Sequence, residues 1–327
     1  MDERFIRTRM IMGENAVERL ARAHVAVFGV GGVGGYVVEA LARSGVGHIE
    51  IVDNDKVCLS NINRQIIAAE SSLGRYKVDA AKERILDINP DIEVTVHRCF
   101  YLPDGKSLNE QGEVVSKSPN GQGEVVNKSL NEQGKVVNKS LNEQGKVSDK
   151  SRIEQGEITD KSQLEQGNAS DKSQCNGSEI DFTRFDYVVD AVDTVTAKLG
   201  IICESKRLGI PVISIMGCGN RLDPTKLKVA DIYETRNDPL SRIMRKELKK
   251  RGITSLKTVF STEEAIKPDA EAADQERLLD QMPQEDVKEK EYQSRRRSTP
   301  GSAIFVPAAA GLIAAGEVCR ELAGISL

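Results

Sequence analysis

The stretch that decides the fold is HVAVFGVGGVGGYVVEALARSGVGHIEIVD, residues 24–53. It opens with a β-branched run at 24–30, continues with helical spacing at 34–44, and ends with a second apolar run at 48–53. Gly45 ends the expected helix. A strand, a helix and a second strand within about 30 residues indicate a β-α-β unit. We therefore expect an α/β fold: a Rossmann-like, mostly parallel sheet with helices on both faces.

The same alternation continues on both sides of a long interruption. Before it, we expect a helix at 77–88, which Asn89-Pro90 stops, and a strand at 93–99. After it, strands are expected at 185–193, 211–217 and 228–234, with helices at 196–208 and 238–252 and an apolar C-terminal helix after an extended segment.

The interruption is a repeat with a period of 11 residues. The dipeptide Gln-Gly begins at positions 111, 122, 133, 144, 155 and 166. An 11-residue period can belong to a helical supercoil, but every unit holds a glycine and few aliphatic side chains. We therefore expect residues 107–178 to be a disordered, low-complexity insert. The polar stretch 267–299 is expected to be a mobile crossover-type loop.

The amino-acid composition excludes few classes of function. The chain has 46 basic and 50 acidic residues, so only a local basic patch could attract nucleic acid. Its six cysteines form no C-x-x-C pair, which argues against a zinc ribbon, and their scattered spacing indicates thiols, not a disulfide framework. The N-terminus is charged and no long apolar run occurs, so we expect a cytoplasmic protein with no membrane partner.

The glycine turn from Gly29 to Gly34 predicts a bound phosphate. Glycines between a strand and a helix let backbone N–H groups approach phosphate oxygens at a helix N-terminus. Asp53 ends the next strand, where an acid can bind the hydroxyls of a ribose. These features suit a dehydrogenase that binds NAD as well as they suit an ATP enzyme.

Two cations favour ATP. Arg64 and Lys77 follow in LSNINRQ (59–65) and GRYKV (74–78). A dehydrogenase needs neither cation at this place, whereas an enzyme that releases pyrophosphate must balance the charge of a triphosphate. Arginine offers a planar fork to phosphate oxygens, and lysine offers a compact charge.

Together with RFIR (4–7), IVDNDKVCLSNINRQ (51–65) and DAVDT (190–194), these segments resemble the ubiquitin-activating-enzyme-like adenylyltransferases, which include activators of sulfur-carrier proteins. The resemblance implies a single ATP-binding adenylating domain formed by 1–106 and 179–327, using ATP and Mg²⁺. It implies a homodimer in which Arg7 enters the partner's ATP site. It also implies a catalytic set of Arg7, Arg64, Lys77 and Asp193, Mg²⁺ at Asp193, and nucleotide contacts at Gly29, Gly31, Gly32, Gly34, Asp53, Asp55, Asn61, Arg64, Gln65 and Lys77.

Within that superfamily the chain resembles the tRNA threonylcarbamoyladenosine dehydratases. The matching segments are VCLSNINRQI (57–66), NRLDPTKLKVADIYET (220–235) and VFSTE (259–263). This resemblance implies adenylation of the carboxylate of threonylcarbamoyladenosine at position 37 of tRNA, followed by ring closure and loss of water. A basic helix would then attract the anticodon-loop backbone through Arg242, Arg245, Lys246, Lys249, Lys250 and Arg251; a solvated helix face explains the same residues without a nucleic acid.

Three other hypotheses remain. The chain could be an adenylyltransferase for a sulfur-carrier protein, although it lacks the paired cysteines that such activators often carry. It could be an NAD-binding oxidoreductase, or a nucleotide-sensing scaffold that binds partners through its repeats. No cysteine is expected to be a nucleophile, Cys218 is expected to fill space, and His24, His48 and His97 are expected to be structural.

Overall fold

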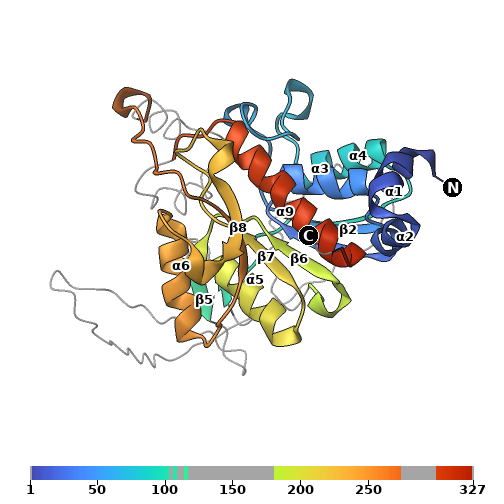
Figure 1. The fold of residues 1–327 in the computed structure, drawn as a ribbon. Coiled ribbons are helices and arrows are strands. Elements are labelled where there is room, and N and C mark those ends of the chain that lie inside the picture. The colour runs from blue at the N-terminus through green and yellow to red at the C-terminus, as the bar shows by residue number, and fades with distance from the viewer. Residues whose placement is uncertain (1, 103–105, 109–113, 117–179, 274–299, 326–327) are drawn as a thin grey trace, which may run out of the picture.

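The computed structural model describes residues 2–102, 106–108, 114–116, 180–273 and 300–325. A seven-stranded sheet in the order β3-β2-β1-β6-β7-β9-β8 forms its centre (Figure 1). Neighbouring strands are parallel except for β8 and β9, which are antiparallel. The strands are β1 (His24–Phe28), β2 (His48–Val52), β3 (Glu93–His97), β6 (Tyr187–Asp190), β7 (Val212–Ile215), β8 (Leu227–Asp231) and β9 (Lys257–Ser261).

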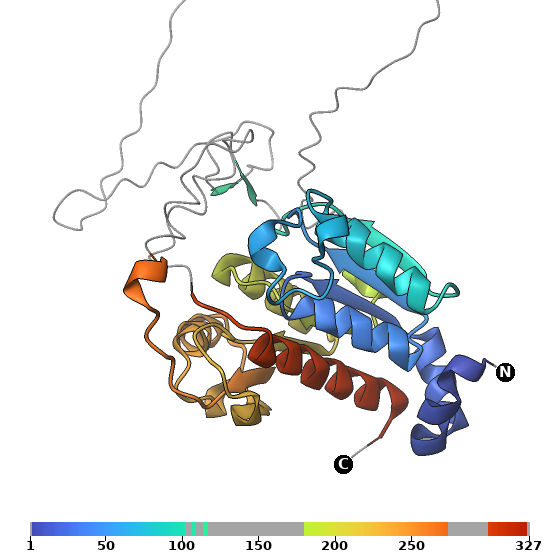
Figure 2. The ribbon, with the colours of Figure 1, turned by 90° about the horizontal axis from the view of Figure 1, so that it is seen from above.

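Helices cover both faces of the sheet, which confirms the predicted fold class. One face carries α3 (Gly34–Ser44), α4 (Lys77–Ile88) and α9 (Phe305–Ala323), which lie in one layer in Figure 2. The other carries α5 (Val195–Leu208) and α6 (Pro239–Lys250). Successive residues of a strand face opposite sides. In β1, accordingly, Val25 and Val27 pack under the first layer while Ala26 and Phe28 pack under the second.

Two further helices, α1 (Ile6–Met12) and α2 (Glu14–Arg22), precede the sheet. They lie at the amino ends of the strands, since α2 leads directly into β1. Short 3-10 helices connect the larger elements: η1 (Glu3–Phe5), η2 (Leu59–Asn61), η3 (Glu70–Ser72), η5 (Phe182–Arg184), η6 (Pro224–Lys226) and η7 (Ile232–Glu234). In the described part of the chain, no helix is both long and apolar enough to cross a membrane.

The pairing of β1 with β6 sets the switch point of the sheet, where open α/β sheets of this kind have a crevice. β2 and β3 extend the sheet on one side of β1, and β6 begins the other side. The register pairs Phe28 with Asp190, so both strands end at the same level. In open α/β sheets, ligands bind outside the carboxyl ends of the strands at this kind of switch point. The glycine turn and the DAVDT segment therefore meet there.

Some element boundaries differ from expectation. The strand expected at 228–234 ends at Asp231, because that carboxylate accepts the Tyr233 N–H at 2.9 Å and starts η7. The strand expected at 185–193 is shorter, Tyr187–Asp190. Within the expected insert, β4 (Lys106–Leu108) and β5 (Val114–Ser116) form a separate antiparallel pair. Residues 109–113 and 117–178 of the insert, and 274–299 of the expected loop, lie outside the described residues.

Candidate active site

The glycine turn holds the N-terminus of α3 open. Gly29 has a φ of +86°, and a Cβ on Gly34 would lie 1.8 Å from the Gly29 carbonyl oxygen. Only glycine therefore permits this close approach. Within the described part of the chain, the N–H groups of Gly31, Gly32 and Gly34 donate no hydrogen bond, so three donors at a helix start remain open to a ligand. This is the arrangement that binds phosphate oxygens.

Asp53 closes one side of the turn. Its carboxylate accepts the Val30 N–H at 2.7 Å and the Asp55 N–H at 2.8 Å. Lys77, at the start of α4, donates to the Asp55 carboxylate at 2.6 Å. Its side chain is 7% exposed. Burial disfavours the ammonium charge, but the carboxylates of Asp53 and Asp55 outweigh it and raise the pKa of Lys77. Burial also raises the pKa of Asp53 against the opposing Lys77 charge.

The loop after β2 carries three further predicted residues and places two of them, Arg64 and Gln65, against the turn. Asn61 and Gln65 are buried, each 6% exposed. A Cβ on Gly31 would lie 3.9 Å from Gln65 Nε2, and a Cβ on Gly32 would lie 3.5 Å from Arg64 Cγ. The Arg64 guanidinium donates to the Ser60 carbonyl at 2.7 Å and to the Asn63 side chain at 3.0 Å. Both contacts lie within its own loop, so the guanidinium can turn toward an anion.

DAVDT forms the opposite wall. A Cβ on Gly29 would lie 2.8 Å from the Ala191 carbonyl oxygen, so the segment packs directly on the glycine turn. Asp193 lies two residues beyond this contact, is exposed, and accepts the Thr194 hydroxyl at 3.2 Å. A carboxylate at this edge is the ligand type that Mg²⁺ prefers.

The C-terminal segment closes the site from a third side, which the sequence did not reveal. Asn63 Nδ2 donates to the Ser302 carbonyl at 2.9 Å, and Pro307 Cβ lies 3.5 Å from the Cβ position of Gly32. α9 packs so closely on α3 that a Cβ on Gly311 would lie 2.5 Å from the Val33 carbonyl oxygen. Because Asn63 and Ser302 are 239 residues apart, no local pattern could indicate the contact.

The donors of this site fit a nucleoside triphosphate. The open N–H groups, Arg64 and Lys77 match anionic oxygens, and Asp53 offers an acceptor for ribose hydroxyls. In addition, Gln65 Oε1 is buried and has no hydrogen-bond partner among the described residues. A buried polar atom of this kind usually has a partner, and a bound polar ligand would supply one.

Comparison with known proteins identifies the family. The ThiF family model matches residues 4–115. A tRNA threonylcarbamoyladenosine dehydratase of Bacillus subtilis is 32% identical over 329 residues, which cover 98% of this chain and 95% of that protein. The chain belongs to the ThiF family. Within that family it stands with the tRNA threonylcarbamoyladenosine dehydratases, which confirms the resemblance seen in the sequence segments.

Solved structures of a tRNA threonylcarbamoyladenosine dehydratase also match the fold of this chain. The tRNA N6-threonylcarbamoyladenosine dehydratase of E. coli in complex with AMP matches with a TM-score of 0.65 at 26% identity. The match covers 98% of this chain and 94% of that one. The ATP complex of the same enzyme matches with a TM-score of 0.63 and the same coverage.

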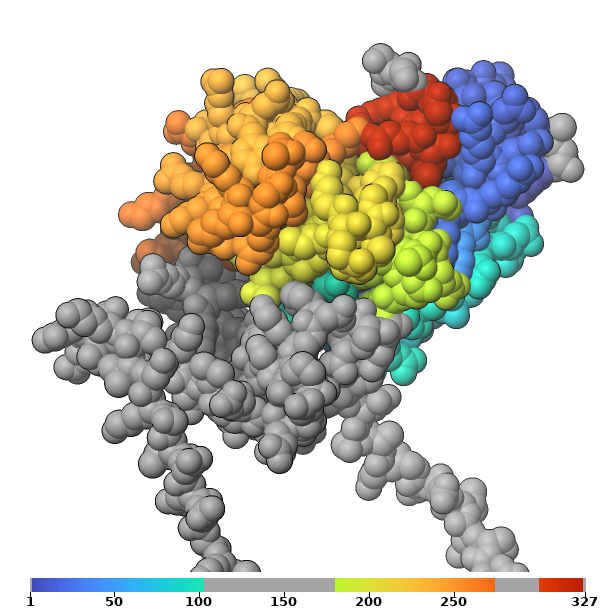
Figure 3. Space-filling view, turned by 90° about the horizontal axis from the view of Figure 1, so that it is seen from below, coloured from blue at the N-terminus to red at the C-terminus, as the bar shows by residue number. Residues whose placement is uncertain are grey.

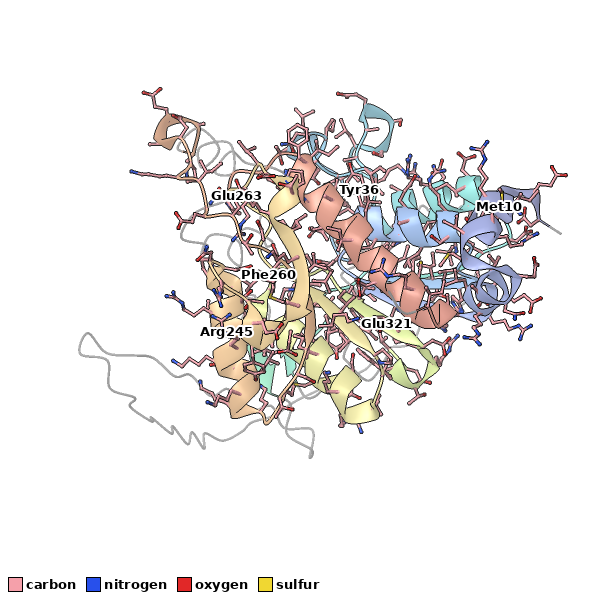
Figure 4. All side chains as sticks on the ribbon, viewed as in Figure 1. Met10, Tyr36, Arg245, Phe260, Glu263 and Glu321 are labelled. Atoms are coloured by element: carbon pink, nitrogen blue, oxygen red, sulfur yellow. The ribbon has the colours of Figure 1, made fainter. Side chains whose placement is uncertain are left out.

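Arg7 is not brought to the site within this ThiF-family chain. It is exposed on α1, and Phe5, just before it, lies against Gly45 at the C-terminal end of α3. The glycine turn is at the other end of that 11-residue helix, roughly 16 Å away. Figure 4 shows Met10, also on α1, at the opposite end of the molecule from Arg245. Arg7 therefore lies far from the glycine turn of its own chain.

The basic helix of this ThiF-family chain divides into two groups. Arg245 donates to the Thr235 carbonyl at 3.0 Å, and Lys250 and Arg251 pair with Glu247 at 2.6 and 2.9 Å. The other three basic residues are exposed, lie at helical spacing on one side of α6, and make no ion pair with any described residue: Arg242, Lys246 and Lys249. Figure 3 views the face of the molecule that α5 and α6 form.

The three histidines form one network around Glu50. His24 and His97 contact the two carboxylate oxygens at 3.1 and 2.7 Å, and the His24 and His48 rings stack at 3.5 Å with 7° between their planes. Side-chain atoms of His24, His48 and Glu50 lie within 4.8 Å of one another, which is close enough for a metal site. A metal lies near the plane of each imidazole that binds it, and two parallel planes cannot share one ion. The network therefore favours the expected structural role, although the sequence did not reveal its partner Glu50.

The cysteines are partly as expected. Cys58, Cys203, Cys218 and Cys319 are free, and burial raises the pKa of Cys218 to about 12, so this thiol is protonated at neutral pH. Cys99 is disulfide-bonded, and its partner lies outside the described residues. The expectation of thiols throughout is therefore wrong for Cys99.

Proposed function

We propose that this chain is an ATP-dependent, cyclising enzyme that dehydrates N6-threonylcarbamoyladenosine at position 37 of tRNA by adenylating its carboxylate. One observation carries the proposal. Open N–H groups, Arg64 and Lys77 converge on one crevice in a chain that matches a Bacillus subtilis tRNA threonylcarbamoyladenosine dehydratase over nearly its whole length. The E. coli relative of 26% identity is known in complex with ATP and with AMP.

The chain binds the nucleotide through the glycine turn. The N–H groups of Gly31, Gly32 and Gly34 donate to phosphate oxygens, while Gly29 sets the turn that exposes them. Asp53 accepts from ribose hydroxyls, and the Val30 and Asp55 N–H groups fix its carboxylate in place. ATP, when bound, supplies the adenylyl group that makes a carboxylate oxygen part of a good leaving group.

The cations act on the charge that develops as pyrophosphate departs. Lys77 is held by Asp55 close to Asp53, so its ammonium is fixed before the reaction begins and needs no reorganisation. Arg64 turns from its loop carbonyl to phosphate oxygens, and Asn61 and Gln65 complete the polar wall. Asp193, on the opposite wall, would hold Mg²⁺, which would supply positive charge to offset that of the departing pyrophosphate.

The tRNA backbone lies on α6. Arg242, Lys246 and Lys249 form a cationic stripe there that pairs with no described residue, whereas Arg245, Lys250 and Arg251 are engaged within the chain. The stripe is therefore the part of the predicted basic patch that contacts phosphates. Contacts of this kind position an RNA without reading its bases.

The active form is a cytoplasmic homodimer. Arg7 of each copy completes the ATP site of its partner, since it cannot reach the site of its own chain. Residues 1–106 and 179–327 form the single adenylating domain. The insert 107–178 takes no part in the chemistry, because the site is built wholly from residues outside it.

Mass spectrometry of nucleosides tests the proposal. tRNA that carries threonylcarbamoyladenosine is incubated with the protein, ATP and Mg²⁺, digested and analysed. Loss of one water from the modified nucleoside, dependent on ATP, is the expected result. An unchanged nucleoside together with an adenylated C-terminus on a sulfur-carrier protein would instead establish the carrier-activating function.

A further inference from the structure

A fully buried ion pair lies directly behind the DAVDT wall. Lys198, on the first turn of α5, and Asp190, at the end of β6, are each 0% exposed, with Nζ 3.0 Å from Asp190 Oδ2. Ser214 of β7 donates to the same carboxylate oxygen at 2.5 Å. Lys198 also donates to the Ile215 carbonyl at 2.7 Å and contacts Ser214 Oγ at 3.3 Å. The pair thus joins two strands and a helix at the edge where the site lies.

Stability alone does not account for this pair. Replacing a buried ion pair by apolar residues is often neutral or stabilising, because desolvation cancels most of the attraction. A cation in the first turn of α5 also opposes the helix dipole, which favours negative charge at that end. A local reason must therefore keep Lys198 in place.

The other oxygen of Asp190 supplies that reason. Asp190 Oδ1 accepts the Val192 N–H at 3.3 Å, while the Ala191 N–H donates to the Phe28 carbonyl at 2.9 Å. These two bonds set the course of the backbone through Ala191 and Val192, which packs on Gly29 and leads to Asp193. The backbone that leads to Asp193 is therefore tied to a carboxylate that Lys198 and Ser214 hold.

We propose that Lys198 is a positioning residue that, through Asp190 and Val192, sets Asp193 in place to bind the Mg²⁺ of Mg·ATP. Its three N–H donors are engaged by Asp190, Ser214 and Ile215, so it touches no substrate. The inference rests on the proposed role of Asp193.

Calorimetry on the full chain tests it without catalysis. The probes are AMP and α,β-methylene-ATP, and the second is titrated both with and without Mg²⁺. We call the Kd of α,β-methylene-ATP without Mg²⁺ divided by its Kd with Mg²⁺ the magnesium gain. Lys198→Met should reduce the magnesium gain about tenfold or more, as loss of a residue behind a metal ligand typically does, with the Kd for AMP within about twofold. Ser205→Ala, which removes another buried hydroxyl of α5 bonded only to the Ile201 carbonyl at 2.8 Å, should leave both quantities unchanged.

A second variant keeps the test decisive if Lys198→Met leaves Asp190 uncompensated and does not fold. Asp190→Leu/Lys198→Met removes both charges and should fold; it should also lose the magnesium gain. If this double variant keeps the magnesium gain while Asp193→Asn loses it, the positioning role of Lys198 is overturned but the proposed role of Asp193 stands. Equal loss of AMP binding would show a merely structural role. A wild-type protein with no magnesium gain would overturn the role of Asp193 and the inference with it.

Discussion

At the scale of the residue, the site depends on a lysine that is charged although it is buried. Lys77 has a side chain 7% exposed, and it remains an ammonium because Asp53 and Asp55 lie beside it. A fixed charge of this kind stabilises a transition state more than a mobile surface lysine does, because it is already oriented. The carboxylates that raise its pKa thus keep Lys77 charged for the catalytic role we propose for it.

Lys77→Gln should lower kcat/KM for ATP by about 100-fold, the usual loss when one fixed donor to developing charge is removed. Steady-state kinetics of AMP release measures it. Lys82→Gln is the matched control, since Lys82 lies on the same helix and donates to the Val94 carbonyl at 3.0 Å, away from the crevice. A loss below about threefold for Lys77→Gln would contradict the assigned role.

The buried carboxylate of Glu50 should make the stability of the fold depend on pH in the acid range. Burial opposes its charge, but hydrogen bonds and charge from His24 and His97 outweigh burial and lower its pKa to about 2. A lowered carboxyl pKa stabilises the fold fully above the unfolded value near 4.5, and this stabilisation is lost as the pH falls toward about 2. Urea unfolding between pH 5 and 2.5 should therefore show a smaller decline for Glu50→Gln than for the wild type, by up to about 3 kcal/mol.

Glu83→Gln is the control for this measurement, because Glu83 is an exposed acid paired with Arg75. It should follow the wild-type pH dependence. Parallel curves for Glu50→Gln and the wild type would show that the histidine network does not hold the Glu50 charge.

At the scale of the element, the close packing of α9 on α3 keeps the C-terminal segment on the nucleotide crevice. Gly311 permits this approach, since its Cβ position is 2.5 Å from the Val33 carbonyl oxygen. Gly311→Ala should separate the helices, destabilise the fold by about 1–3 kcal/mol, and raise the KM for ATP. Thermal melting and initial-rate kinetics measure the two effects.

Gly316→Ala on the same helix separates packing from helix propensity. Its Cβ position meets only the end of a flexible side chain, Arg320 Nη1 at 3.5 Å. This variant should be neutral or more stable than the wild type by up to about 1 kcal/mol. Equal effects of the two substitutions would exclude close packing at Gly311 as the cause.

The stripe on α6 predicts how tRNA binding responds to salt. Arg242→Ala/Lys246→Ala/Lys249→Ala should weaken binding of tRNA with little dependence on its sequence. The slope of log K against log salt should fall in magnitude by about 2, because each phosphate contact releases counterions. Filter binding or anisotropy across a salt series measures the slope.

The control removes the same charge from another part of the surface: Arg22→Ala/Arg43→Ala/Lys82→Ala. It should change the slope by less than about 0.5, since these cations contact no tRNA in our account. A control that alters the slope as much as the stripe variant would show that only overall charge matters.

The sequence predicted the elements that local patterns define. The turn at Gly29–Gly34 lies between β1 and α3 as expected, and Asp53 and Lys77 lie beside it. Contacts across long separations were not predictable. Asn63 meets Ser302, and Glu50 meets His24 and His97, only because the sheet order and register bring them together. Lys198 was likewise missed, since its buried partner follows from tertiary packing and not from helical spacing.

At the scale of the whole molecule, the proposed role of Arg7 means that one active site needs residues from two copies of the chain. Mixing inactive Arg7→Ala with inactive Lys77→Gln should restore activity, because the mixed dimer holds one site with both residues. If subunits exchange at random, half of the dimers are mixed, and one of the two sites in each mixed dimer is intact. About a quarter of the wild-type activity is therefore expected.

The matched control mixes Arg64→Ala with Lys77→Gln. Both residues belong to the same chain's site, so no mixed dimer contains an intact one, and activity should not return. Restoration in this control, or none in the first mixture, would contradict a shared site.

We propose that the crevice adenylates a carboxylate of the modified tRNA. The most direct measurement starts from tRNA in which both oxygens of the threonylcarbamoyl carboxylate are ¹⁸O and follows the label by mass spectrometry. Attack of a carboxylate oxygen on the α-phosphorus releases pyrophosphate, and ring closure then expels AMP with that oxygen. The account predicts AMP that contains one ¹⁸O atom for each water lost from the nucleoside. Unlabelled AMP, or ADP with ¹⁸O in inorganic phosphate, would contradict it.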